Sequence, residues 1–177
     1  MRQKMKQLMG ILLSLVMVLG LMPGMSLTAY AATDTYTTLK NNATVVKFNG
    51  YDWYIIEDNS TSDGKGTVTL LAADNKFGLS AFSDSYSNAY SSSKVKAVLD
   101  ALTAEGGAFA SVKDAIADTN LSDVGVTGAK LYLLSTSEAE PYKNFNFSGA
   151  SYGGWWLRSP GRSAIDAACV FGEDGRV

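Results

Sequence analysis

The sequence predicts an α+β fold, in which a twisted, mostly antiparallel sheet carries two or three short helices, with long loops on one side. Three features predict this class. Asn49-Gly50 separates two alternating apolar runs, residues 155–158 alternate between two faces ahead of a Pro-Gly turn, and one amphipathic stretch follows Ser93. Strand patterns therefore outnumber helical ones.

The N-terminus has the pattern of a secretory signal. Three basic residues precede an apolar run over residues 8–21, and Ala29-Tyr30-Ala31 is the small-x-small pattern that signal peptidase recognises. The run has about 14 residues, and a spanning helix needs roughly 20. We expect residues 1–31 to be a signal peptide removed near Ala31, leaving no membrane span in the mature chain. An uncleaved N-terminal anchor is the alternative.

The mature chain, residues 32–177, is acidic and contains no histidine. Removal of the three basic residues of the signal leaves 12 basic against 17 acidic side chains. This balance argues against nucleic acid and anionic membranes as partners. Without histidine, Ser-His-Asp and Cys-His catalysis and His-ligated zinc are excluded. We expect no cofactor and no metal.

Cys169 is the only cysteine, so the chain cannot form an internal disulfide. For an exported protein this fits a bacterium whose secreted proteins use few disulfides. We expect Cys169 to be a small core residue rather than a nucleophile.

Residues 32–44 are polar and are expected to be a flexible lead-in to a single globular domain over residues 45–177. The domain begins with a hairpin, because Asn49-Gly50 suits a type I′ turn that needs positive φ twice. The loop over residues 58–66 resembles a calcium loop in part. It does not match the EF-hand pattern, which requires glycine at the sixth position of the loop. Counted from Asp58, Gly64 is the seventh residue.

A third strand is expected over residues 67–73. Residues 77–93 are rich in serine and aromatic side chains and predict an irregular surface loop. A helix capped by Ser92 or Ser93 follows and ends at Gly106-Gly107, and a second short helix is expected near residues 109–118.

The C-terminal third predicts a buried strand over residues 130–134, followed by the capping box of residues 135–138. The short helix that this box opens should end at Pro141. After an aromatic loop and the strand at residues 155–158, residues 159–162 fit a type II turn with positive φ at Gly161.

The last predicted strand covers residues 165–171, with Ile165, Ala167, Cys169 and Phe171 facing inward. Residues 172–175 form a turn that only two residues follow. Either this strand pairs on both sides with earlier strands, or the chain is a fragment. We expect the second: a domain that is C-terminally incomplete and lacks its last strand.

Taken together, these segments resemble a family of exported domains of unknown function from Clostridia-type Firmicutes. The resemblance is carried by residues 46–54, 66–72 and 129–135, and most specifically by Trp155-Trp156-Leu157-Arg158-Ser159-Pro160-Gly161. It covers nearly the whole mature chain. Family members usually continue into a final strand with a Gly-Val-Arg-Pro-like ending, which this chain lacks.

The closing pattern of the family is distantly similar to C-type-lectin-like folds, which include formylglycine-generating enzymes and the variable ligand-binding proteins of bacterial retroelements. The oxidase chemistry of those enzymes depends on a cysteine pair and copper, as the resemblance implies. One cysteine cannot supply the pair, so this activity is not expected here.

The candidate ligand-binding residues lie on and before the strand at residues 155–158. Trp155 and Leu157 should be buried, whereas Trp156 and Arg158 share the opposite face and can stack. In a structural interpretation Arg158 also bridges an acid such as Asp166. In a functional interpretation this face is a platform for a sugar ring or a peptide. Aromatic residues of the preceding loop would assist it: Tyr142, Phe145, Phe147 and Tyr152.

We therefore expect an exported, non-catalytic binding module of a bacterial cell surface, with a glycan or a protein as ligand. Two alternatives stay open. A carboxylate-dependent glycoside hydrolase needs only two acids at a set separation, although no spacing here marks such a pair. A structural spacer between other modules is the second alternative.

Overall fold

The computed structural model describes residues 11–12, 16–20, 28–31, 44–61, 66–73, 76–143 and 154–171. Its strands are β1 (Ile11–Leu12), β2 (Val16–Gly20), β3 (Thr28–Ala31), β4 (Thr44–Phe48), β5 (Tyr51–Asp58), β6 (Thr67–Ala72), β7 (Leu79–Ser80), β8 (Thr119–Leu121), β9 (Val126–Ala129), β10 (Leu131–Tyr132), β11 (Gly154–Pro160) and β12 (Ala167–Phe171). Its helices are α1 (Lys94–Thr103), α2 (Thr136–Ala139) and the 3-10 helices η1 (Tyr90–Ser92), η2 (Ala110–Ala115), η3 (Ser122–Val124) and η4 (Glu140–Tyr142).

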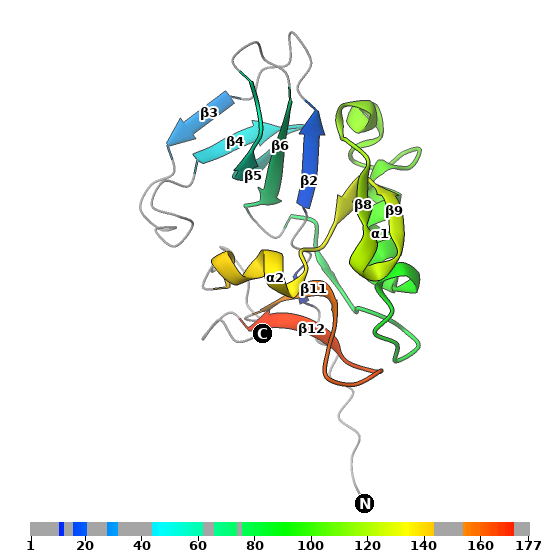
Figure 1. Cartoon of the computed structure of the whole chain (residues 1–177). Coiled ribbons are helices and arrows are strands. Elements are labelled where there is room, and N and C mark those ends of the chain that lie inside the picture. The colour runs from blue at the N-terminus through cyan, green and yellow to red at the C-terminus, as the bar shows by residue number, and fades with distance from the viewer. Residues whose placement is uncertain are drawn as a thin grey trace, which may run out of the picture.

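The strands form two sheets and a short ribbon (Figure 1). The larger sheet has the order β10-β2-β6-β5-β4-β3, the smaller has the order β12-β11-β1-β7, and β8 pairs with β9. Among the described pairings only β1 with β11 is parallel. The predicted mixture of mostly antiparallel sheets with few short helices is confirmed, whereas a C-type-lectin-like arrangement is not.

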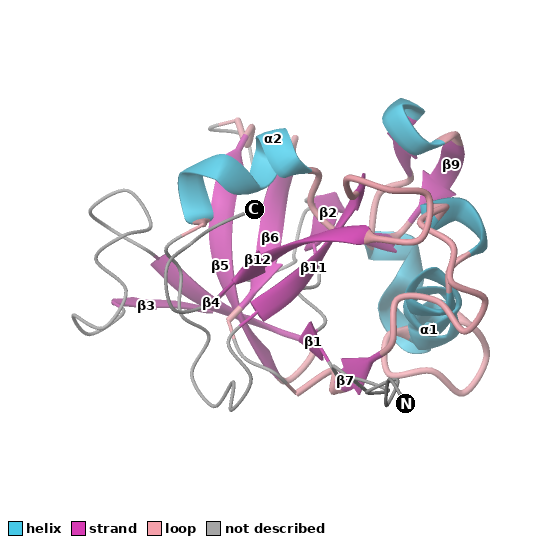
Figure 2. Cartoon of the chain, turned by 90° about the horizontal axis from the view of Figure 1, so that it is seen from below, coloured by secondary structure: helices cyan, strands magenta, loops and turns pink. Residues whose placement is uncertain are grey.

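The two sheets are joined by α2 and flanked by α1. Figure 1 shows α2 between the β5–β6 end of the larger sheet and the β11–β12 pair, and Figure 2 shows α1 at the opposite side of the molecule. Trp53 of the larger sheet and Trp155 of the smaller sheet belong to one buried hydrophobic cluster. The two sheets therefore share a single core.

The Asn-Gly hairpin forms as predicted. Asn49 and Gly50 have φ values of 50° and 79°, which a type I′ turn requires. Val46 then faces Trp53, whose indole nitrogen donates to Phe48 O at 3.1 Å. The turn thus sets the register that places Trp53 in the core with no exposed surface.

The segment predicted to be a signal peptide supplies β1, β2 and β3 in the structure of the full chain. β2 pairs with both β6 and β10, and β3 pairs with β4 at the edge of the larger sheet. Met17 is fully buried. Because residues 1–31 were expected to be removed as a signal peptide, these three strands were not predicted. Of the predicted lead-in, residues 32–44, the last residue, Thr44, begins β4, and residues 32–43 lie outside the described residues.

The helix caps follow the local rules. Ser93 caps α1 by accepting from the Lys96 amide at 3.1 Å, and Ser135 and Glu138 complete the predicted capping box of α2. The second predicted helix is the 3-10 helix η2. The α-helix α2 ends at Ala139, two residues before Pro141, in line with the prediction. The chain then continues as the 3-10 helix η4 with Pro141 near its start, where the missing amide costs no helical hydrogen bond.

The strand β11 buries Trp155 and Leu157, as predicted. The turn that follows differs from the prediction. Gly161 does not have a positive φ; its amide donates to Asp166 O at 2.6 Å, and a Cβ at Gly161 would lie 2.5 Å from that oxygen. Close backbone approach, rather than left-handed geometry, therefore requires glycine there.

The inward face of the last strand was predicted only in part: Ala167 packs against the core as predicted, whereas Ile165 does not belong to the buried set. β12 begins at Ala167, Ile165 is 62% exposed, and Val170 is fully buried, while Cys169 is half-buried against the core. The register is shifted by an irregularity between Trp156 and Pro160. Ahead of this irregularity Val170 pairs with Trp155, so the two side chains lie on the same, buried face. Residues 172–177, on which the prediction of an incomplete domain rests, lie outside the described residues.

Across the described ranges, no helix combines the length and the apolar character that crossing a membrane requires.

Candidate functional site

Arg158, a predicted ligand-binding residue, is 5% exposed and holds an ion-pair network inside the protein. Its Nε donates to Asp123 Oδ2 at 2.9 Å, and its Nη2 donates to Glu138 Oε1 at 2.8 Å. Nη1 donates to Glu138 Oε2 and, at 2.9 Å, to Leu133 O. All three guanidinium nitrogens therefore have acceptors within the fold.

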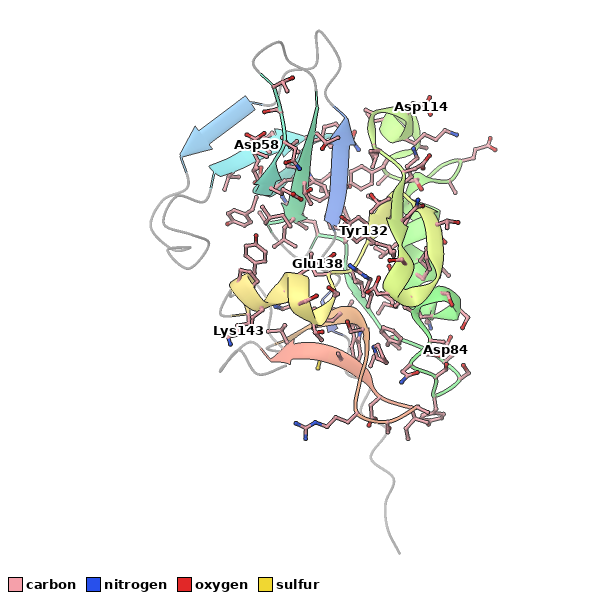
Figure 3. The ribbon with its side chains drawn as sticks, viewed as in Figure 1. Asp58, Asp84, Asp114, Tyr132, Glu138 and Lys143 are labelled. Carbon is pink, nitrogen blue, oxygen red and sulfur yellow. The ribbon has the colours of Figure 1, made fainter. Side chains whose placement is uncertain are left out.

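Glu138 serves two elements at once. Its Oε2 accepts from the Ser135 amide at 2.8 Å, which caps α2, and both of its oxygens bind Arg158. Partial burial alone would raise the pKa of Glu138, but the hydrogen bonds from Arg158 and Ser135 outweigh it and hold the pKa below its usual value. Figure 3 shows Glu138 and Tyr132 close together in the middle of the molecule. The Arg158 Cζ lies 5.7 Å from the centroid of the Tyr132 ring.

This network joins four elements: β11 through Arg158, α2 through Glu138, η3 through Asp123, and β10 through Tyr132. The sequence suggested Asp166 as the acid partner. The carboxylate of Asp166 instead accepts from Ser163 Oγ at 2.7 Å. Arg158 is therefore part of the packed interior of the domain. Its positive charge is balanced by Asp123 and Glu138, without a ligand.

Tyr142, the second predicted site residue in the described part of the chain, is also buried. It is 8% exposed, and its hydroxyl donates to Ile56 O at 3.2 Å. It therefore attaches η4 to β5. The other predicted aromatics of this loop, Phe145, Phe147 and Tyr152, lie outside the described residues.

Trp156 is half-buried and supports a neighbouring loop. Its indole nitrogen donates to Ser80 O at 2.9 Å, and its ring meets that of Phe82 edge-on at 5.4 Å between centroids. Phe82 is buried, and its ring centroid lies 6.5 Å from that of Tyr90. Trp156 therefore fixes the beginning of the serine-rich loop that leads to α1.

That loop lies beside the turn between β11 and β12. The Asn88 amide donates to Ala164 O at 3.1 Å, and Asn88 Nδ2 donates to Ser163 O at 2.8 Å. Figure 3 shows Asp84 beside this turn, although the two segments are far apart in the sequence. We call residues 81–89 together with residues 161–166 the two-loop rim.

Tyr86 is at the exposed tip of the two-loop rim. It is 76% exposed, and it is one of two described non-glycine residues with positive φ, at 52°. A bulky residue pays about 1–2 kcal/mol for the left-handed region, so this conformation is imposed by the loop around it. Ile165 of the second segment is 62% exposed.

The rim is ordered by its own short side chains. Ser83 Oγ accepts from the Ser85 amide at 3.2 Å, and Ser87 Oγ accepts from the Ala89 amide at 3.2 Å. Lys94 at the start of α1 reaches Asp84 at 3.0 Å. The exposed Tyr86 ring therefore lies on a loop in which backbone amides on both sides of it, those of Ser85 and Ala89, are hydrogen-bonded.

The described residues contain no set of three or more metal-ligating side chains in one place. In the predicted calcium-like loop, Asp58 accepts from the Ser60 amide at 2.9 Å, which is a local turn, and residues 62–65 are not described. Burial raises the pKa of the Cys169 thiol above its usual value, which disfavours the nucleophilic thiolate.

The sequence did not predict the exposure of Tyr86, the bonds of Asn88 to the second loop, or the pairing of Arg158 with Asp123 and Glu138. One signal for Tyr86 was present. Phe82, Tyr86 and Tyr90 occur at spacings of four, but the serine content argued against a helix. In an irregular loop such residues need not share a face, and Tyr86 is the one that points outward.

Comparison of the chain with protein-family models, with curated proteins and with solved structures gave no match.

Proposed function

We propose that the protein is an exported, non-catalytic binding module of a bacterial surface, and that its ligand contacts the two-loop rim. The observation that carries the proposal is Tyr86, an aromatic ring 76% exposed on a loop anchored to a second loop by Asn88. Stiff rings on preformed loops lose little entropy on binding. The export and the bacterial surface rest on the N-terminal pattern and on the family resemblance.

The composition of the rim favours a neutral saccharide as the ligand. A pyranose has an apolar face that can stack on the Tyr86 ring, and hydroxyl edges that can bond to Ser85 and its neighbours. Within residues 81–89 the one charged side chain is that of Asp84, and it forms an ion pair with Lys94. The segment around Tyr86 therefore has little net charge.

A protein ligand is the second candidate, and one observation favours it. Ile165 adds an exposed apolar side chain on the segment that Asn88 joins to the Tyr86 loop. Protein interfaces use such apolar anchors beside tyrosine, whereas a saccharide has less need of them.

A glycan array probed with the labelled wild-type chain and with Tyr86→Asn tests the proposal. Asparagine tolerates the left-handed backbone at this position, so the ring is removed without new strain. We expect the wild type to bind neutral saccharides and Tyr86→Asn to bind them at least tenfold more weakly. Leu79→Asn, which removes an apolar side chain 54% exposed outside the rim, is the matched control and should bind as the wild type does. Equal binding by wild type and Tyr86→Asn would contradict the proposal.

A further inference from the structure

The strand β2 occupies an interior position of the larger sheet although it belongs to the segment with the signal pattern. Its register with β6 runs from Val16 opposite Leu71 to Gly20 opposite Thr67. On its other edge, Val16 faces Tyr132 and Met17 faces Leu131. Both pairings are antiparallel. One short strand therefore connects β10 to the rest of the sheet.

The position that β2 occupies is apolar and buried. Met17, Leu70 and Leu71 are fully buried, and Leu131 is 1% exposed. If β2 were removed, one edge of β6 and one edge of β10 would present unpaired backbone groups next to this apolar surface. An edge of that kind is a template for another strand.

We propose that removal of residues 1–31 converts the gap between β6 and β10 into a binding site for an apolar β-strand of another polypeptide, which takes the place of β2. This inference goes beyond the proposed function and rests on the predicted cleavage near Ala31. Main-chain hydrogen bonds to β6 and β10 would provide affinity, and the buried position of Met17 would select the side chain.

The structure of the full chain specifies what the incoming strand must be. It has at least five extended residues, as β2 does, and runs antiparallel to both neighbours. An uncharged apolar residue faces the core at the position of Met17, since a charge there would lie unpaired among buried leucines. In the uncleaved chain the site is filled from within, so cleavage and strand binding are coupled.

The test uses the full chain, purified without processing, with a protease recognition sequence inserted between Ala31 and Ala32, so that cleavage releases residues 1–31. After cleavage, the probe is a labelled synthetic peptide of residues 14–21 carrying lysines at its ends, added in excess over the released fragment. We expect saturable binding by fluorescence anisotropy, and slowed hydrogen exchange at the amides of Thr67–Ala72 and Leu131–Tyr132. A peptide carrying Met17→Lys should bind at least tenfold more weakly.

Three results would overturn the proposal: no binding of the peptide, equal binding of the two peptides, or unchanged amide protection when the fragment is removed and no peptide is added. If the cleaved chain unfolds when the fragment leaves, recovery of its near-ultraviolet tryptophan dichroism by the wild-type peptide supports the proposal. Failure to recover contradicts it. Tyr86→Asn should leave peptide binding unchanged, so the strand site and the two-loop rim are tested separately.

Discussion

Arg158 and Glu138 form a two-pronged ion pair in which Nη2 donates to Oε1 at 2.8 Å and Nη1 donates to Oε2. The same carboxylate accepts from the Ser135 amide and so caps α2. The side chain of Arg158 is 6% exposed and that of Glu138 is 43% exposed. The pair therefore lies at the border of the core, where it fixes α2 on β11.

Replacement of Arg158 with Met should lower the free energy of unfolding by about 3 kcal/mol, because it removes one partner of a buried network and leaves Leu133 O without this donor. Urea unfolding followed by tryptophan fluorescence measures the change. Lys143→Met is the matched control, since it breaks the exposed pair with Glu140 and should cost less than about 1 kcal/mol. Equal losses in the two variants would contradict a structural role for Arg158.

The free energy of unfolding should depend on pH in a way that shows the contribution of the ionised Glu138 carboxylate. Its pKa is lowered in the folded protein, so its contribution is present above its unfolded-state pKa of about 4.3 and is lost as the pH falls through the lower folded-state value. Between about pH 5 and pH 3 the wild type should therefore lose more stability than Glu138→Gln. Urea midpoints at several pH values measure this difference. Parallel pH profiles would argue that the carboxylate is not stabilised in the folded state.

Local chemistry explains what the sequence predicted well. The Asn49-Gly50 turn, the Ser93 cap and the capping box at Ser135 each depend on neighbours within a few residues, and all three are present. The burial of Trp155 followed from strand alternation. These features could be predicted because short-range rules decide them.

The rest depends on contacts between distant segments. Arg158 meets Glu138 and Asp123, which are 20 and 35 residues away, so spacing could not identify them. Val170 is buried because it pairs with Trp155 of β11, a pairing that the alternation within residues 165–171 could not reveal. β2 was missed because a signal pattern and a buried strand have the same apolar composition.

Tyr86→Asn should not destabilise the protein, and a gain of up to about 1 kcal/mol is expected, because asparagine accepts the left-handed backbone that a tyrosine resists. Thermal or urea unfolding measures the difference. Phe82→Ala, four residues earlier and buried, is the contrast and should cost about 3 kcal/mol. A Tyr86→Asn variant that loses more than about 1 kcal/mol would show that the ring serves packing instead of binding.

Gly161→Ala should distort the turn of the two-loop rim, because the new Cβ would lie 2.5 Å from Asp166 O. We expect a loss of about 1–3 kcal/mol and faster hydrogen exchange at the Asn88 amide, which donates to Ala164 O in this turn. Ser163→Ala, which removes the hydroxyl bond to Asp166 and the weaker bond from the Ile165 amide but adds no atom to the turn, is the milder control. If Gly161→Ala leaves exchange at Asn88 unchanged, the two segments do not depend on each other as described.

Trp156→Phe should separate support of the loop from direct ligand contact. The variant loses the 2.9 Å hydrogen bond from the indole to Ser80 O while keeping an aromatic ring against Phe82. We expect a stability loss of about 1 kcal/mol and faster exchange in residues 81–89, with saccharide affinity reduced less than in Tyr86→Asn. A larger loss of affinity in Trp156→Phe than in Tyr86→Asn would indicate that the ligand binds at β11 and not at the two-loop rim.

The most direct measurement is chemical-shift mapping of the nitrogen-15-labelled chain during titration with the saccharide that binds most strongly on the array. The account predicts that shifts concentrate in residues 83–89 and 161–166, and that Tyr86→Asn abolishes them while Leu79→Asn does not. Shifts centred on other elements, or an unchanged titration of Tyr86→Asn, would contradict the claim that the two-loop rim is the binding surface.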